Sequence, residues 1–202
     1  MSALEVADWR RQIHALCVKV RNATDLPAAH DLWRRTRDRL FAEHPSSPLL
    51  SEDRAAFTGL PTRPYEAGWR FELPLLPAEP VRLDVETGTD GTVPFERVGF
   101  VDVPGIGTLD VWQLASYGGG LFVPVRDALA GAKGGTYGGG RYLLDTVKGA
   151  DLGSGHADLV LDFNFAYNPS CAYDPAWACP LAPPGNVVAV DLPVGERYFG
   201  AH

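Results

Sequence analysis

Residues 158–166 carry the side chains in this sequence that are best suited to chemistry. Apolar residues occupy the odd-numbered positions, which predicts a strand with one face in the core. Asp162 and Asn164 then project together from the other face, roughly 7 Å apart. We expect this face to enclose a hollow, although a solvated outer face is the alternative. A buried carboxyl with a shifted pKa could act in acid–base catalysis, so Asp162 and Tyr167 are candidate catalytic residues.

The next segment, 167–186, is rich in proline and contains Cys171 and Cys179. Prolines restrict the unfolded chain, so an ordered loop is easier to hold, and such loops often carry function. The two thiols could be small buried side chains, a disulfide or redox pair, or half of a metal site. The remaining metal ligands would have to be His156, Asp162 or Asp174.

A second group of candidate residues contains Arg126 and, further along the chain, the glycine-rich stretch 136–142, which includes Arg141. Glycine lets backbone amides approach a ligand, and arginine recognises carboxylate or phosphate. A structural ion pair, Arg126–Asp162 or Arg141–Asp127, explains the same residues equally well. The candidate ligand-binding residues are therefore Arg126, Asp127, Tyr137, Arg141, Tyr142, Asn164 and Asn168. No P-loop, dinucleotide fingerprint, Gly-x-Ser-x-Gly or His-Glu-x-x-His motif occurs.

Two helices are expected before these segments. Apolar residues at helical spacing predict one helix over 4–22 and a second over 26–43, with Asp25 as the N-cap of the second. Pro45 and Pro48 end the helical part, because proline also restrains the residue before it. We expect the two helices to form a hairpin that covers a later sheet.

From residue 69 the apolar pattern changes to a period of two, which predicts strands. The fold class is α+β, mainly β: an N-terminal helical hairpin (1–45) packed on an antiparallel sandwich or partly closed barrel of about eight strands (65–202). One domain is expected over residues 1–202. The strands are expected near 69–75, 81–86, 93–103, 108–116, 120–126, 140–147, 158–166 and 186–191.

Charge and composition limit the possible partners. The net charge is −7, and residues 55–202 contain nine Lys or Arg against seventeen Asp or Glu, so nucleic acid is an unsuitable partner. A basic run in the helices is either a solvated face or a surface for an acidic partner. No apolar stretch could span a bilayer and no signal peptide is visible. Three cysteines are too few for a disulfide scaffold, so the cytoplasm is the expected compartment.

Several ordered motifs resemble the domain-of-unknown-function family 1684 (DUF1684). They are Tyr137–Tyr142, Asp162–Asn164 with Tyr167–Pro169 and Cys171, Cys179–Leu181 with Pro183, Pro184 and Asn186, Gly195–Glu196, Phe122–Asp127 and Ser47–Leu49. Gly185 departs from the pattern, as does the absence of Thr-Ser-Gly after Asp127. The resemblance implies a complete, single-domain prokaryotic protein of bacterial type, and it transfers no activity.

Three functional hypotheses follow. The first is a small polar or anionic molecule bound at the Asp162/Asn164 face, with or without acid–base catalysis. The second is thiol-redox or metal chemistry at Cys171 and Cys179, with His156. The third is a structural or interaction protein without a small-molecule site. The cofactor and the oligomeric state stay open.

Overall fold

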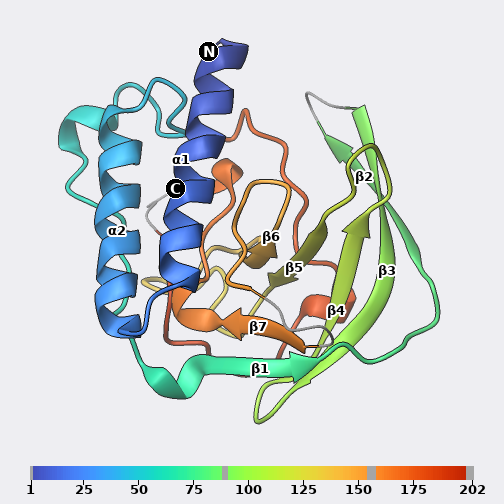
Figure 1. Cartoon of the computed structure of the whole chain (residues 1–202). Coiled ribbons are helices and arrows are strands. Elements are labelled where there is room, and N and C mark those ends of the chain that lie inside the picture. Colours follow the sequence, from blue (N-terminus) through green and yellow to red (C-terminus); the bar gives the residue numbers. More distant parts are fainter. Residues whose placement is uncertain (1, 88–90, 154–157, 199–202) are drawn as a thin grey trace.

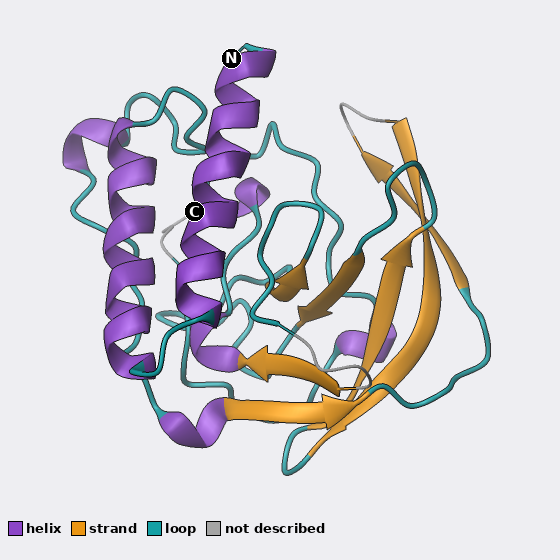
Figure 2. Ribbon diagram, in the orientation of Figure 1, coloured by secondary structure: helices purple, strands orange, loops and turns teal. Residues whose placement is uncertain are grey.

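A helical hairpin and two antiparallel sheets make up the protein in a computed structural model, which describes residues 2–87, 91–153 and 158–198 (Figure 1). The hairpin lies on one side of the molecule and the larger sheet on the other, as the colouring by element in Figure 2 makes clear. The smaller sheet runs between them (Figure 1). This arrangement confirms the predicted fold class, and neither sheet closes into a barrel.

Local capping sets the ends of the two helices. α1 spans Ala3–Arg21 and α2 spans Leu26–Glu43, within one residue of the predicted bounds. Ser2 and Glu5 form a capping box at α1, and the Asp25 side chain accepts a hydrogen bond from a first-turn amide of α2. None of the described helices is long and apolar enough to cross a membrane.

The described part of the chain contains seven strands. They are β1 (Arg70–Pro74), β2 (Arg82–Thr87), β3 (Gly91–Val103), β4 (Gly107–Leu114), β5 (Leu121–Val125), β6 (Arg141–Asp145) and β7 (Asp158–Asp162). β2 to β6 form one five-stranded antiparallel meander, and β1 pairs with β7. The two sheets meet where Leu76, just after β1, exchanges backbone hydrogen bonds with Phe100 of β3. A Cβ on neighbouring Gly99 would collide with the Leu76 carbonyl oxygen, so only glycine fits there.

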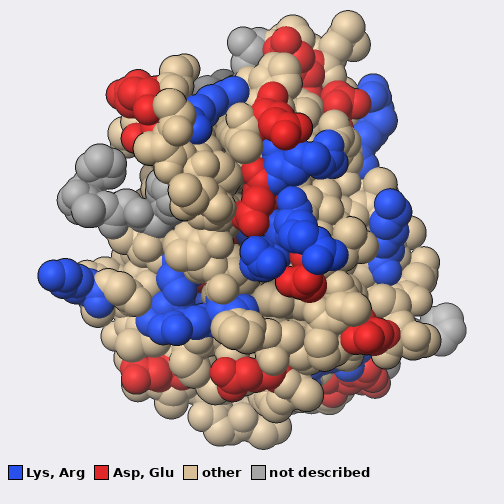
Figure 3. All heavy atoms as spheres, turned by 90° about the vertical axis from the view of Figure 1, so that its left-hand side faces the viewer, with Lys and Arg blue, Asp and Glu red and all other residues tan. Residues whose placement is uncertain are grey.

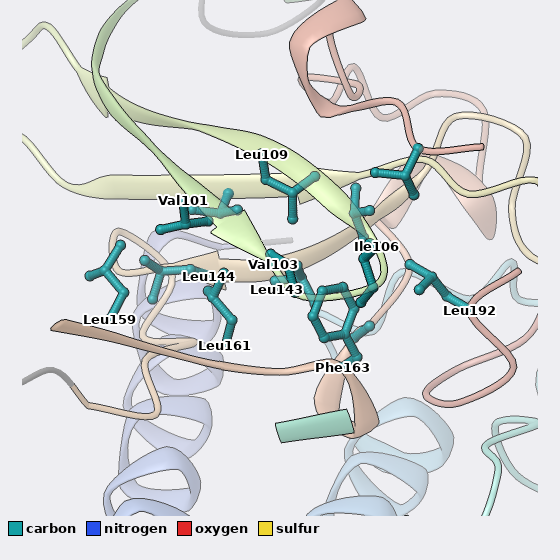
Figure 4. Close-up of a cluster of buried hydrophobic side chains, with 14 of the residues drawn as sticks. Val101, Val103, Ile106, Leu109, Leu143, Leu144, Leu159, Leu161, Phe163 and Leu192 are labelled. Carbon is teal, nitrogen blue, oxygen red and sulfur yellow. The ribbon is translucent and has the colours of Figure 1, made fainter. Parts of the chain in front are cut away.

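The main core lies between the two sheets (Figure 4). Alternate residues of β3 and β4 supply Val101, Val103, Leu109 and Val111, all at most 1% exposed. Apolar residues of β5, β6 and β7 and of the C-terminal segment complete the core. Burial of these branched side chains is the principal source of stability for the sandwich.

Three expectations about single elements are wrong. The strand predicted over 158–166 ends at Asp162, because Phe163–Phe165 forms a 3-10 turn. The strand predicted over 186–191 is absent from the described residues, where Val187 makes only an isolated bridge with Arg126. The hairpin covers the segment after β7 in place of a sheet face: its apolar side chains pack on residues such as Phe165 and Tyr173.

Candidate functional site

Asp162 and Asn164 are buried, but they satisfy each other and the backbone. Asp162 Oδ1 accepts hydrogen bonds from the Asn164 amide (3.0 Å) and from Asn164 Nδ2 (2.7 Å), while Oδ2 accepts one from the Tyr65 hydroxyl (3.2 Å). Asn164 also donates to the Glu66 carbonyl and accepts from the Glu66 amide. These contacts fold the chain at the end of β7 and leave Asn164 no free polar atom for a ligand.

A hollow does lie beside Asp162, but its cations already have partners. Arg21 and Arg70 line this hollow with Asp162, whereas Asn164 does not. Arg21 pairs with Asp151 at 2.9 Å and Arg70 with Glu72 at 2.7 Å. An anion here would have to compete with these carboxylates, so the geometry gives little support to a ligand at this face.

Replacing Asp162 with asparagine should therefore change the pH dependence of stability more than its size. Burial raises the pKa of Asp162 in the folded protein, against the opposing effect of the hydrogen bonds from Asn164 and Tyr65. Between the unfolded value of roughly 4 and the raised value, the folded state binds more protons, so the stability contributed by this carboxyl falls as pH rises. Urea unfolding of both proteins at several pH values should show that the stability of Asp162→Asn, relative to that of the wild type, increases from acid to neutral pH. A gain in the opposite direction would contradict the raised pKa.

Arg141 and Asp127, predicted as either an anion site or an ion pair, form a buried ion pair. Each side chain is 1% exposed, and the pair is 2.5 Å apart. Arg141 also donates to the backbone carbonyls of Leu192, Val194 and Glu196, and so holds the C-terminal segment against β6. Arg126 is elsewhere, with its Nε donating to the carbonyl of Gly138 at the surface. These arginines do not converge on a ligand site.

The other candidates help to line a cavity under the helical hairpin. Each helix contributes one row of side chains four residues apart, a spacing that places them on one face. The rows are Trp9, Ile13 and Cys17 of α1, and Trp33, Arg37 and Phe41 of α2. The cavity offers about 80 Å³ to the centres of water molecules, several times the roughly 10–15 Å³ that one water needs.

The floor of the cavity comes from β6 and from the segment after β7. Tyr142 and Tyr167 exchange backbone hydrogen bonds of 2.8 and 3.1 Å, which set their rings edge to face with centroids 5.6 Å apart. Asn168, Ser170 and Tyr173 follow along the same wall. The structure thus brings together predicted residues Tyr142, Tyr167 and Asn168, but not Asp162, which lines the other hollow.

A buried ion pair that the sequence did not reveal lies at one side of this cavity. Arg37 is 5% exposed and Glu196 is 0% exposed, with Nη1 and Oε2 2.8 Å apart. Glu196 also accepts hydrogen bonds from the Tyr173 hydroxyl and from Asn168 Nδ2 (3.0 Å). Burial opposes the charge of Arg37, but Glu196 outweighs this effect and the pKa of Arg37 is raised. Arg37 therefore stays a cation beneath the cavity.

The Arg37 guanidinium is also enclosed by aromatic rings. Its Cζ lies 4.5 Å from the centroid of Trp33, 5.4 Å from that of Phe41 and 5.5 Å from that of Tyr167. Such contacts stabilise a desolvated cation. One polar atom on this wall, the acceptor Asn168 Oδ1, is buried without a hydrogen-bond partner in the described residues.

The two cysteines of the proline-rich segment, Cys171 and Cys179, form no disulfide and are both half-buried. The Tyr137 hydroxyl lies 3.6 Å from Cys171 Sγ. Within the described ranges no three His, Cys, Asp or Glu side chains are grouped to hold a metal, and His156 lies outside them. Cys17, by contrast, is buried, which raises the pKa of its thiol to about 11.

The basic run of the helices is mostly a solvated face. Arg34 and Arg35 both pair with Asp31, at 3.0 and 2.7 Å, and Arg11 pairs with Asp8. Figure 3, which views the hairpin side, shows basic and acidic side chains intermixed there. Arg37 is the exception, because it turns inward into the ion pair described above.

Comparison with known proteins places these features in a wider group. A family model described as "Protein of unknown function (DUF1684)" matches residues 55–197, a range that contains the floor of the cavity and Glu196 but not the two helices. The solution NMR structure of an uncharacterized protein from gene locus rrnAC0354 of Haloarcula marismortui is similar, with a TM-score of 0.59 and 35% identity. The match covers 85% of this chain and 94% of that one. No curated protein matches.

Proposed function

We propose a function for this chain on the premise that it belongs to DUF1684, a family of proteins of unknown function. Neither the family nor the archaeal relative supplies an activity, so the proposal rests on the cavity alone. The chain binds a small organic acid with an apolar or aromatic body under the helical hairpin. The observation that carries this proposal is a buried cation on the cavity wall, Arg37, together with the acceptor Asn168 Oδ1, which has no hydrogen-bond partner in the described residues.

A buried polar atom without a partner is costly, by roughly 1–3 kcal/mol, and calls for an explanation. A carboxylate oxygen would accept from Arg37, and a hydroxyl or protonated group of the ligand could donate to Asn168. Both groups are fixed by their other contacts, with Glu196 and with aromatic rings. A ligand would therefore meet preorganised polar groups, as in typical small-molecule sites.

The charge of the lining favours an acid over a base. Arg37 and Lys148 are the charged side chains on the cavity surface, and both are cations. Their carboxylate partners lie behind the surface: Glu196, and Asp145 at 3.8 Å from Lys148. Burial also raises the pKa of Asp145, which weakens it as a counterion.

The ring-rich walls favour an apolar body in the ligand, because aromatic faces attract planar and aliphatic groups. Catalysis is not part of the proposal. Burial raises the pKa of Tyr167 well above its ordinary value, so its hydroxyl stays protonated and cannot act as a base at neutral pH. The other candidate catalytic residue, Asp162, lines a different hollow.

Benzoate and benzyl alcohol test the proposal, since they share a ring and differ in the anion. Titration calorimetry, with the fluorescence of Trp9 and Trp33 as a second readout, should give benzoate a dissociation constant of about 1 mM or lower. Benzyl alcohol should bind roughly tenfold more weakly, because it lacks the charge that Arg37 and Lys148 attract. No binding of benzoate at about 10 mM, ten times the expected constant, would reject the organic acid and favour a structural role.

Two variants locate the binding. Ala150 lines the cavity, so Ala150→Leu should fill it and weaken benzoate at least about tenfold, whereas Ala55→Leu on an exposed turn should have no effect. Lys148→Gln should weaken benzoate a few-fold, while Lys133→Gln at an exposed site should not. Equal binding to Ala150→Leu and the wild type would place the benzoate elsewhere.

The cellular compartment is also part of this proposal, and we place the chain in the cytoplasm. All three cysteines are free, which suits the cytoplasm, where thiols are kept reduced. A bacterial source and a small-molecule ligand remain part of the proposal, because the similar solved structure is archaeal and uncharacterised.

A further inference from the structure

The larger sheet has apolar side chains on both faces, and a second hollow lies on the face away from the main core. On β4, Leu109 and Val111 enter the main core, whereas Trp112 and Leu114 point to the opposite face, because successive side chains of a strand alternate. Four buried aromatic residues form a separate cluster on that face: Phe95, Trp112, Phe122 and Tyr142. The hollow over this cluster offers about 160 Å³ to the centres of water molecules. We call it the sheet-side hollow.

The sheet-side hollow lies between the larger sheet and α1. Strands β3 to β5 supply its apolar floor: Val93, Phe95, Leu114 and Phe122. Its rim includes exposed Arg10 of α1 together with Ala178 and Pro180 of the proline-rich segment, which passes between α1 and the sheet (Figure 1). The Tyr142 hydroxyl donates to the Pro180 carbonyl at 2.6 Å and so holds this rim in place.

The sheet-side hollow adjoins the cavity under the hairpin. Tyr167, Tyr142, Phe122 and Phe95 form an aromatic row in which successive ring centroids are 5.6, 4.8 and 5.5 Å apart. The two tyrosines line the cavity and the two phenylalanines line the hollow. Lys148 lines both spaces, and its Nζ lies 5.6 Å from the ring centroid of Tyr142. The two spaces therefore meet at Lys148 and Tyr142 and share one aromatic wall.

The charges along this path suit an acid with a long apolar tail. Arg37 is the buried cation in the cavity, and Lys148 follows where the two spaces meet. Asp145, which lines the hollow, is engaged by Lys148: its carboxylate lies 3.8 Å from Lys148 Nζ and accepts a hydrogen bond from the Lys148 amide. Beyond Lys148 the floor is apolar, and the aliphatic stem of the lysine can lie along a tail that passes it.

We propose that the ligand is a medium-chain aliphatic acid, with its carboxylate in the cavity under the hairpin and its tail in the sheet-side hollow. This inference rests on the proposed function, and it selects an acyl chain as the apolar body of the ligand. A ring fills the cavity alone, whereas a flexible chain passes Lys148 and covers the half-buried Val93 and Leu114. Burial of apolar surface on the chain and on the sheet then adds to the attraction of the cations.

Butyrate and octanoate test the tail, because they share a carboxylate and differ only in chain length. Each further methylene that is buried should tighten binding about threefold, so titration calorimetry should show octanoate at least about tenfold tighter than butyrate. Octanoate should also displace benzoate. Equal binding of octanoate and butyrate, with benzoate still bound, would overturn the tail and leave the proposed function standing. Binding of neither benzoate nor octanoate would instead overturn both.

A variant at the rim separates the two spaces. Ala178→Phe should fill the sheet-side hollow and bring octanoate close to the affinity of butyrate, while benzoate binds as in the wild type. Ala176→Phe, at an exposed position of the same segment, is the matched control and should change neither ligand. Ala150→Leu should weaken octanoate and benzoate alike, because it fills the cavity that holds both carboxylates. Octanoate binding that survives Ala150→Leu would place the acid in the hollow alone and overturn the shared path.

A second variant leaves the rim segment unchanged. Val147 lines the sheet-side hollow and is 44% exposed, so Val147→Asn can be made at little risk to folding and should weaken octanoate a few-fold by removing apolar contact. Val187→Asn, at a site that is 45% exposed and outside the hollow, should have no effect. Octanoate affinity equal to the wild type in both Ala178→Phe and Val147→Asn would show that the tail lies elsewhere.

Discussion

Replacing Glu196 with glutamine is expected to lower the free energy of unfolding by about 3–5 kcal/mol. Glu196 is 0% exposed and is the carboxylate paired with buried Arg37. Glutamine keeps the size and can still accept from Tyr173 and Asn168, but it leaves the Arg37 guanidinium without a counterion. The cost of an unpaired charge in a buried setting exceeds that of a lost surface pair by several-fold.

Urea unfolding, followed by circular dichroism and by tryptophan fluorescence, measures this loss. Arg37→Met should destabilise by a similar amount, and the double variant Arg37→Met/Glu196→Gln should lose clearly less than the two single losses added together. Arg35→Met, which removes a surface pair with Asp31, should change stability by less than about 1 kcal/mol. Additive losses in the double variant would show that the two side chains do not depend on each other.

The expected elements were predictable where the signal is local. Caps, helical spacing and alternation are properties of neighbouring residues, so both helices and all seven described strands could be placed from the sequence, although the last strand was predicted too long. β6 illustrates the limit of such patterns, since all five residues from Arg141 to Asp145 are buried. Arg141 can be buried because Asp127 and the carbonyls of residues 192–196, distant in the sequence, accept its hydrogen bonds, whereas Asp145 is paired with nearby Lys148.

The alternation of apolar and polar residues after Asp162 wrongly predicted a continued strand, and the reason is physical. Odd- and even-numbered residues point to opposite faces only while the backbone stays extended. Here the Asp162 side chain accepts a hydrogen bond from the Asn164 amide, and a 3-10 turn begins. Phe163, Asn164 and Phe165 are consequently all buried. Short polar side chains compete with the strand in this way, and an Asp two residues before an Asn is the one signal that could have indicated it.

The cavity was only partly predictable. Tyr142, Tyr167 and Asn168 stood out by residue type, but Arg37 looked like one more member of a basic helix face. Its spacing of four residues from both Trp33 and Phe41 was a usable signal, because it places the cation in an aromatic row. Glu196 had no such signal, since it reaches Arg37 across 159 positions of sequence, a separation that only the folded chain closes.

Loss of the Arg141 side chain should lower the free energy of unfolding by a similar amount and should loosen a longer part of the chain. Arg141 connects β6 to Asp127 and to three carbonyls of residues 192–196, which carry Glu196 to Arg37. Arg141→Met leaves a buried carboxylate and three carbonyls without this donor, so we expect a loss of about 3–5 kcal/mol. Unfolding in urea, with Arg126→Met at the surface as the control, measures this loss.

Lysine at position 141 separates charge from geometry. An ammonium group keeps the positive charge but cannot span Asp127 and the carbonyls of Leu192 and Val194 as the guanidinium fork does, so Arg141→Lys should recover only part of the stability. Hydrogen exchange should also show faster exchange of the Glu196 amide, which bonds to the Ala166 carbonyl, in both variants. Protection of that amide equal to the wild type would mean that the C-terminal segment is held in place without Arg141, and that Glu196 reaches Arg37 by its other contacts alone.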